Sequence, residues 1–304
     1  MPPPVTPHPD DPVELIFAPE GLATRLRFAL LGRPLIWSSL KWAQRFPESL
    51  TPAQRMKVQR TLSSSILTHL NVKLELHGLE NIGPTAAVKG PYLIASLHEG
   101  IADVPCLLQL PLMMRFVARR EIFTWPEIGP VLGKLGHVSI NPEHPLGGFR
   151  DLLRGAEEIL GGGESLVTFP QGTIAGIQSD FQRGVFEVAK LLGVPILPVA
   201  LTGAHRIWEH PFAPTLRSGV RVGLRVLPPI SAEEVRSAHP ETLRVRTRRA
   251  IKAAAMSAEM PPARFFDPER DGYWDGYKLD IDPDFPSVAH QMSDHRAAFL
   301  KGTA

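Results

Sequence analysis

The stretch 91-PYLIASLHEGIADVP-105 combines the signal of a buried strand with two side chains that can perform chemistry. Its apolar run YLIASL is typical of a strand covered on both faces, and it ends directly before His98. Asp103 follows five residues later. On a straight helix this spacing would separate the two side chains by about 140°, so they can meet only if the chain bends between them. Gly100 lies at the position where it can bend.

A carboxylate bound to one ring nitrogen of a histidine fixes the tautomer and leaves the other nitrogen to take a proton. His98 and Asp103 are therefore candidates for a general base and the residue that orients it. A structural interpretation fits the same residues, because Asp103 could cap the following helix and His98 could be a satisfied polar residue at a strand end. The pair alone leaves both interpretations open.

Predicted strands and helices alternate on both sides of this stretch. The pattern predicts an α/β fold over residues 71–230, with a mostly parallel sheet flanked by helices and an N-terminal amphipathic helical segment. In such sheets, ligands bind where loops leave the carboxyl ends of the strands. The predicted strands are 72–82, 91–97, 115–118, 137–140, 165–169, 195–203 and 220–230, and the predicted helices are 51–70, 104–113, 148–163 and 185–193.

The two ends of the chain have different compositions from the middle. Residues 1–12 are predicted to be a disordered leader, and residues 13–70 an N-terminal helical segment that associates with a membrane. Within it, 25-RLRFALLGRPLIWSSLKWAQR-45 mixes basic residues with Trp and Leu, which favours a helix lying in a membrane interface; packing on the domain is the alternative. Residues 231–304 are predicted to pack on the domain as a basic helix, 231–259, and a tail. The basic run is interpreted as a solvated face, with contact to anionic lipid or an acidic carrier protein as the alternative.

Composition excludes several classes of function. A formal net charge of +2 is too small for a dedicated nucleic-acid binder. The single cysteine, Cys106, rules out a disulfide framework within the chain and disfavours a cysteine zinc site. The histidines show no metal-ligand spacing, so no metal is expected. The absence of a Gly-x-Ser-x-Gly motif disfavours an α/β-hydrolase.

A second motif, 169-FPQGTI-174, follows a predicted strand and precedes Arg183 and a predicted helix. A histidine five residues before an aspartate, with Phe-Pro-x-Gly-Thr about 70 residues later, resembles the glycerolipid acyltransferases, the family that includes 1-acylglycerol-3-phosphate acyltransferase. The resemblance covers roughly residues 75–205. It is carried by the order of the two motifs.

The resemblance implies an O-acyltransferase of phospholipid biosynthesis. In the family the histidine deprotonates an acceptor hydroxyl, which attacks the thioester of acyl-CoA or acyl-carrier protein, and the aspartate orients the histidine. These roles fall on His98 and Asp103. The acceptor would be a lysophospholipid such as 1-acylglycerol-3-phosphate, and no cofactor beyond the acyl donor is expected.

Because lipid substrates favour a position at the bilayer, the resemblance also implies peripheral attachment at the cytoplasmic face of a membrane. It strengthens the membrane interpretation of residues 25–45. Residues 122–135 are a second apolar stretch that could line a lipid entry or enter the interface. Packing on the domain core is the alternative for both stretches.

The sequence departs from the family where a phosphate would be held. The second motif normally reads Phe-Pro-Glu-Gly-Thr-Arg, and Gln171 and Ile174 replace its glutamate and arginine. Guanidinium groups make bidentate bonds to phosphate, which Ile174 cannot do. The residues predicted to bind substrate are Arg119, Gln171, Gly172, Thr173 and Arg183. The alternatives are the same chemistry on a glycolipid or another lipid alcohol, hydrolysis of a thioester, and an inactive lipid-binding homologue.

Overall fold

The computed structural model describes residues 50–126, 128–142, 144–208, 216–266 and 280–290, together with isolated residues between 22 and 47. The predicted leader, residues 1–12, and most of residues 25–45 lie outside the described residues.

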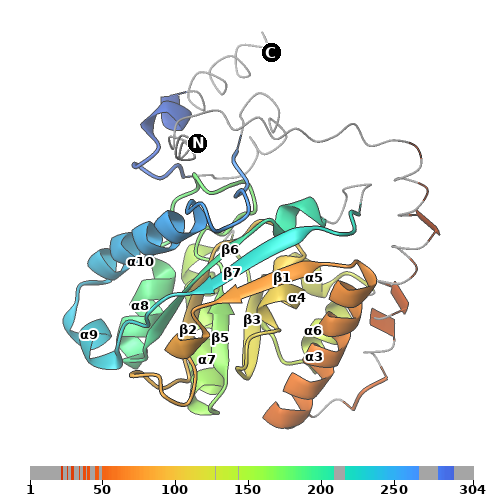
Figure 1. The fold of residues 1–304 in the computed structure, drawn as a ribbon. Helices are drawn as coiled ribbons and strands as arrows, with labels where there is room; N and C mark the ends of the chain where they lie inside the picture. Colours follow the sequence, from red (N-terminus) through yellow and green to blue (C-terminus); the bar gives the residue numbers. More distant parts are fainter. Residues whose placement is uncertain are drawn as a thin grey trace.

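Among the described residues, seven strands form one sheet in the order β1-β7-β6-β2-β5-β3-β4 (Figure 1). Within this sheet of described strands, β6 and β7 pair antiparallel and every other neighbouring pair is parallel. This confirms the predicted α/β fold with a mostly parallel sheet. The strands are β1 (Lys73–His77), β2 (Leu93–Ser96), β3 (Met114–Arg119), β4 (Val138–Ile140), β5 (Ser165–Thr168), β6 (Ile196–Thr202) and β7 (Arg221–Val226).

The helices cover both faces of the sheet (Figure 1). Those fully described are α3 (Pro52–His69), α4 (Asp103–Leu107), α5 (Arg120–Phe123), α6 (Gly129–Lys134), α7 (Pro145–Gly161), α8 (Gly184–Leu192), α9 (Ala232–Ser237) and α10 (Pro240–Ala255), with the 3₁₀ turns η2 (Leu79–Asn81) and η3 (Ala204–Arg206).

Burial on both faces explains why the central strands are apolar throughout. Successive side chains of a strand point to opposite faces, so β2 contributes Leu93 and Ala95 to the core under α7, α8 and α10, and Ile94 to the core under α3 and α4. The neighbouring β6 divides in the same way. A strand in this position has no solvent face, which is why the run YLIASL shows no polar alternation.

One predicted strand and two predicted helices differ in the structure. The strand predicted at 72–82 ends at His77, because Gly78 adopts φ +73° and begins the 3₁₀ turn η2. The helix predicted at 104–113 ends at Leu107, because Pro111 has no amide hydrogen to donate to the Leu107 carbonyl and disfavours helical geometry at Leu110. The helix predicted at 231–259 is two helices, α9 and α10, because Pro240 begins α10 and holds His239 in an extended conformation as its N-cap.

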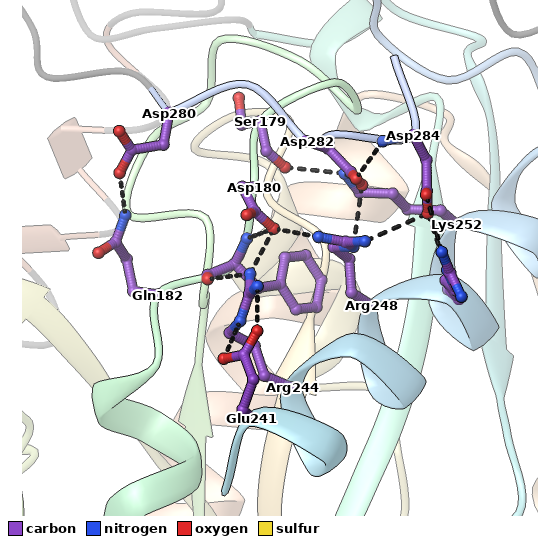
Figure 2. Close-up of polar contacts among 12 residues, drawn as sticks. Ser179, Asp180, Gln182, Glu241, Arg244, Arg248, Lys252, Asp280, Asp282 and Asp284 are labelled. Atoms are coloured by element: carbon purple, nitrogen blue, oxygen red, sulfur yellow. Dashed lines mark hydrogen bonds and ion pairs between the residues drawn. The ribbon is translucent and has the colours of Figure 1, made fainter. Parts of the chain in front are cut away.

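The basic run of α10 is not a solvated face throughout (Figure 2). Arg248 and Lys252 are 1% and 3% exposed. The Arg248 guanidinium lies 2.7 Å from Asp180 and 3.1 Å from Asp282, and the Lys252 ammonium lies 2.5 Å from Asp282. The prediction is therefore wrong for these two residues. Their ion pairs join α10 to the loop before α8 and to the C-terminal residues 280–284.

The apolar stretch 122–135 contains the last two residues of α5 and all of α6. Val131 and Leu135 are buried against Val58 of α3, so one face of the stretch packs on the domain. Within the part of the chain that the structure describes, no helix is long and apolar enough to cross a bilayer.

Candidate active site

The predicted site residues gather at one edge of the sheet. His98 follows β2, the Phe-Pro-Gln-Gly-Thr motif follows β5, and Arg119 ends β3. Because these three strands are parallel neighbours, their carboxyl ends lie side by side. Residues separated by up to 75 positions in the sequence therefore meet in one region.

His98 and Asp103 are in direct contact. The chain bends after β2, and His98 Nδ1 lies 2.6 Å from Asp103 Oδ2. The same oxygen accepts hydrogen bonds from the backbone amides of Glu99 at 2.6 Å and Gly100 at 3.0 Å. Asp103 Oδ2 thus has three hydrogen-bond donors, and these bonds hold the turn at residues 98–103 in place.

The environment of the pair suits proton transfer. Asp103 is fully buried, and this burial raises the pKa of its carboxyl, while the hydrogen bonds from His98 and Gly100 act in the opposite direction. Since the carboxylate accepts from His98 Nδ1, that nitrogen carries the proton and Nε2 is left as the basic nitrogen. The His98 side chain is 23% exposed, so the ring is not sealed from an incoming substrate.

The motif after β5 holds His98 in place. The ring of Phe169 stacks on the imidazole, with centroids 4.0 Å apart and planes inclined by 16°. Gln171 Oε1 accepts a hydrogen bond from the His98 amide at 2.8 Å, and Gln171 Nε2 donates to the Gly176 carbonyl at 2.7 Å. Gln171 is only 4% exposed. In this structure the Gln171 side chain joins the backbone at His98 to the backbone at Gly176. Its contact with substrate stays a prediction.

The other residues predicted to bind substrate lie at the same edge but pair locally. Gly172 is exposed and has φ +67°, a conformation that a side chain would strain. Thr173 Oγ1 accepts from the Ala175 amide at 3.1 Å. Arg119 and Arg183 form ion pairs on their own segments, with Glu121 at 3.5 Å and Glu187 at 2.6 Å respectively.

Two contributors to the site were not identified from the sequence. Phe169 was part of the quoted motif, but nothing in the motif predicts that its ring stacks on His98. Glu99 is 3% exposed and its carboxylate bonds to Gly203, His205 and Arg264, more than 100 positions away. No local pattern could reveal those partners. Cys106 is fully buried in α4, and burial raises the pKa of its thiol, so it packs rather than reacts.

Residues 73–202 match the model of a family described as Acyltransferase. Among curated proteins, the chain is 32% identical to the 1-acyl-sn-glycerol-3-phosphate acyltransferase LPAT1 of Arabidopsis thaliana over 148 residues, which are 48% of this chain and 40% of that protein. It is 31% identical to the corresponding protein BAT2 of Brassica napus over 148 residues, which are 48% of this chain and 42% of that protein. The chain thus spans less than half the length of these relatives.

The fold resembles that of the 1-acyl-sn-glycerophosphate acyltransferase PlsC from Thermotoga maritima, with a TM-score of 0.59. The match covers 77% of this chain and 94% of that one. At 19% sequence identity, this likeness concerns the fold.

Proposed function

We propose that this chain, whose residues 73–202 match the model of the family described as Acyltransferase, moves a fatty acyl group from a thioester to a lipid hydroxyl. The contact between His98 and Asp103 is the observation that carries the proposal. His98 Nε2 removes the proton of the acceptor hydroxyl as its oxygen attacks the thioester carbonyl carbon. The carbon–sulfur bond then breaks, the ester forms, and the departing thiolate takes the proton back from His98. The donor is acyl-CoA or acyl-carrier protein.

Asp103 assists this step by holding the ring and stabilising the imidazolium that forms. Its cradle of backbone amides supports this role, because the carboxylate cannot turn away without losing three hydrogen bonds. Gly172, Thr173, Arg119 and Arg183 are proposed to contact substrate from the surrounding loops. Their shared position at the carboxyl edge of the sheet supports this assignment.

We propose 1-acylglycerol-3-phosphate as the first acceptor to test. The curated relatives carry that substrate in their names, and Arg119 and Arg183 lie at the sheet edge where a phosphate would have to be held. Arg183 is 53% exposed and remains within reach of a ligand despite its ion pair with Glu187.

An uncharged lipid alcohol is the second candidate for the acceptor. It is favoured by Ile174 and Gln171, which replace the arginine and glutamate of the family motif. Ile174 packs against the apolar core, and both ends of the Gln171 amide are bonded to backbone. Neither can contribute a charge to phosphate binding, so the acceptor site is less basic than the family pattern implies.

A transfer assay with the purified full-length chain separates these candidates. Labelled acyl-CoA and acyl-carrier protein are offered to 1-acylglycerol-3-phosphate and to monoacylglycerol, and lipid product is resolved from free fatty acid. We expect phosphatidic acid as the product. An Arg183→Gln variant is expected to raise the KM for the phosphate acceptor by about threefold to tenfold and to leave the KM for the donor unchanged, since it removes one ground-state contact.

The other outcomes of this assay are equally informative. Product from monoacylglycerol alone would select the uncharged acceptor. Free fatty acid without lipid product would indicate a thioester hydrolase. No product with any pair would overturn the proposed activity.

We further propose that the chain attaches peripherally to the cytoplasmic face of a membrane, where water-soluble acyl thioesters can reach it. Three described residues of the N-terminal segment support the attachment: Leu22, Leu26 and Leu30, spaced four apart, are 74%, 51% and 70% exposed. Apolar side chains in such an arrangement suit insertion into a bilayer surface.

Replacing Leu22, Leu26 and Leu30 together with serine is expected to lower binding to vesicles of phosphatidylcholine and phosphatidylglycerol by at least about tenfold, because each inserted leucine contributes roughly 1.5–3 kcal/mol. Co-sedimentation measures the bound fraction. The matched control is the double variant Leu146→Ser, Leu191→Ser, whose side chains are 80% and 64% exposed on other parts of the surface. Equal binding by the triple variant and the control would show that the N-terminal leucines do not contribute to membrane binding.

A further inference from the structure

Glu99 lies between the two halves of the proposed catalytic pair and is anchored far from it. Its carboxylate is buried and accepts three hydrogen bonds, each of 2.8 Å. Oε2 accepts from the Gly203 amide and from His205 Nδ1, and Oε1 accepts from the Arg264 amide. The side chain therefore connects the turn after β2 to the turn after β6 and to the C-terminal part of the chain.

The backbone of the same residue belongs to the proposed catalytic pair. The Glu99 amide donates to Asp103 Oδ2 at 2.6 Å, and its neighbour His98 bonds to the same oxygen. A shift of Glu99 must therefore move both the imidazole and the carboxylate that orients it.

A second connection reaches His98 from the same C-terminal segment, residues 261–266. The Ile177 amide donates to the Arg264 carbonyl, and the Gln178 side chain bonds to both the amide and the carbonyl of Phe266. Gly176, the residue before Ile177, approaches this segment so closely that a Cβ would lie 2.5 Å from the Phe266 nitrogen. The Gly176 carbonyl accepts from Gln171, which holds the His98 amide.

We propose that Glu99 is a positioning residue, through which residues 261–266 set the geometry of His98 and Asp103. The proposal rests on the acyl transfer proposed above. It makes acyl transfer depend on residues 261–266, which lie outside residues 73–202, the part that matches the acyltransferase family model. The working site is thus built from the family domain and the C-terminal segment together.

Steady-state kinetics of Glu99→Gln and Glu99→Ala test the proposal. We expect kcat per folded molecule to fall by about tenfold to a hundredfold in Glu99→Ala, because a displacement of about 1 Å between reacting groups is enough for such a loss. KM should stay within about twofold, since substrate contacts are unchanged. Glu99→Gln should be intermediate, because an amide oxygen in the place of Oε2 still accepts from Gly203 and His205, while an amide nitrogen in the place of Oε1 cannot accept from Arg264.

Two matched comparisons separate positioning from stability. Glu164→Gln removes a charge that is equally buried and lies 2.6 Å from Arg55 at the opposite end of the strands, so it should lower Tm without changing kcat. His205→Leu removes a donor to Glu99 and should lower kcat. His205→Asn places an amide nitrogen near the position of Nδ1 and should restore most of it.

The ring of His98 gives a readout that does not require turnover. In ¹H–¹⁵N NMR spectra, the Nδ1 proton bonded to Asp103 should shift or broaden in Glu99→Ala and should be unchanged in Glu164→Gln. Unaltered kcat and an unaltered Nδ1 signal in Glu99→Ala would overturn the positioning role. Wild-type protein without acyl transfer, but with a signal that depends on Glu99, would instead refute the proposed activity and leave the positioning intact.

Discussion

His98→Ala is expected to lower kcat for acyl transfer by about 10²–10⁴-fold, the usual contribution of a positioned general base. Alanine removes the only group in the pair that can take the proton of the acceptor hydroxyl. The KM values should change little, because the ring contacts Phe169 and Asp103 rather than forming a large substrate surface. Radiolabelled transfer under single-turnover conditions measures the chemical step directly.

The control for this variant is His144→Ala. His144 is exposed before α7, and its side chain makes no capping hydrogen bond there, so its replacement should leave transfer unchanged. Retention of more than about a tenth of wild-type kcat by His98→Ala would be incompatible with general-base catalysis by this residue.

Asp103→Asn refines the assignment. The amides of Glu99 and Gly100 both point at Oδ2, so the asparagine oxygen should occupy that position and keep all three hydrogen bonds. The amide nitrogen would then replace Oδ1, an atom without a hydrogen-bond partner among the described residues. The tautomer of His98 is preserved and only the charge is lost. We expect a smaller decrease than in His98→Ala, of about tenfold to a hundredfold.

The fold could be predicted from the sequence because its decisive signals are local. The run YLIASL marks a strand buried on both faces, and Thr51 before Pro52 marks the start of α3, where the structure has a complete capping box. The break in the C-terminal helix also had a local signal, Pro240, which the overall basic pattern obscured.

In the proposed site too, contacts between residues close in the sequence could be predicted, and contacts between distant residues could not. His98 and Asp103 could be paired from the sequence because five residues and a glycine separate them. The partners of Glu99 are 104 to 165 positions away, and those of Arg248 are 34 to 68 positions away. From the sequence alone, a charged residue on a solvated helix face cannot be distinguished from one that is buried in an ion pair. Only the tertiary structure distinguishes the two.

Asp282→Ala is expected to destabilise the protein by about 3–5 kcal/mol, the usual cost of breaking a buried ion pair by removing one partner. Asp282 is fully buried and faces both the Arg248 guanidinium and the Lys252 ammonium (Figure 2). Alanine would leave those two cations in the interior without this counter-charge. Differential scanning calorimetry should show a decrease in Tm of roughly 6–10 °C.

Asp284→Ala is the matched control, since its carboxylate is 38% exposed and pairs with the buried Arg248 and the exposed Arg249. It should cost less than about 1 kcal/mol. Equal Tm values for the two variants would contradict a special role for the buried carboxylate.

The cost of Asp282→Ala should also depend on pH. Burial lowers the pKa of Lys252 to about 8 even though Asp282 opposes the shift, so removal of Asp282 should lower this pKa further. Between the folded-state pKa and the ordinary value of 10.5 the unfolded chain binds more protons, so stability rises with pH in that window. In Asp282→Ala the pH range over which stability rises begins below pH 8, because the pKa of Lys252 is lower there. The difference in stability from wild type should therefore be largest at neutral pH and smaller at pH 9, because a neutral Lys252 no longer needs the carboxylate.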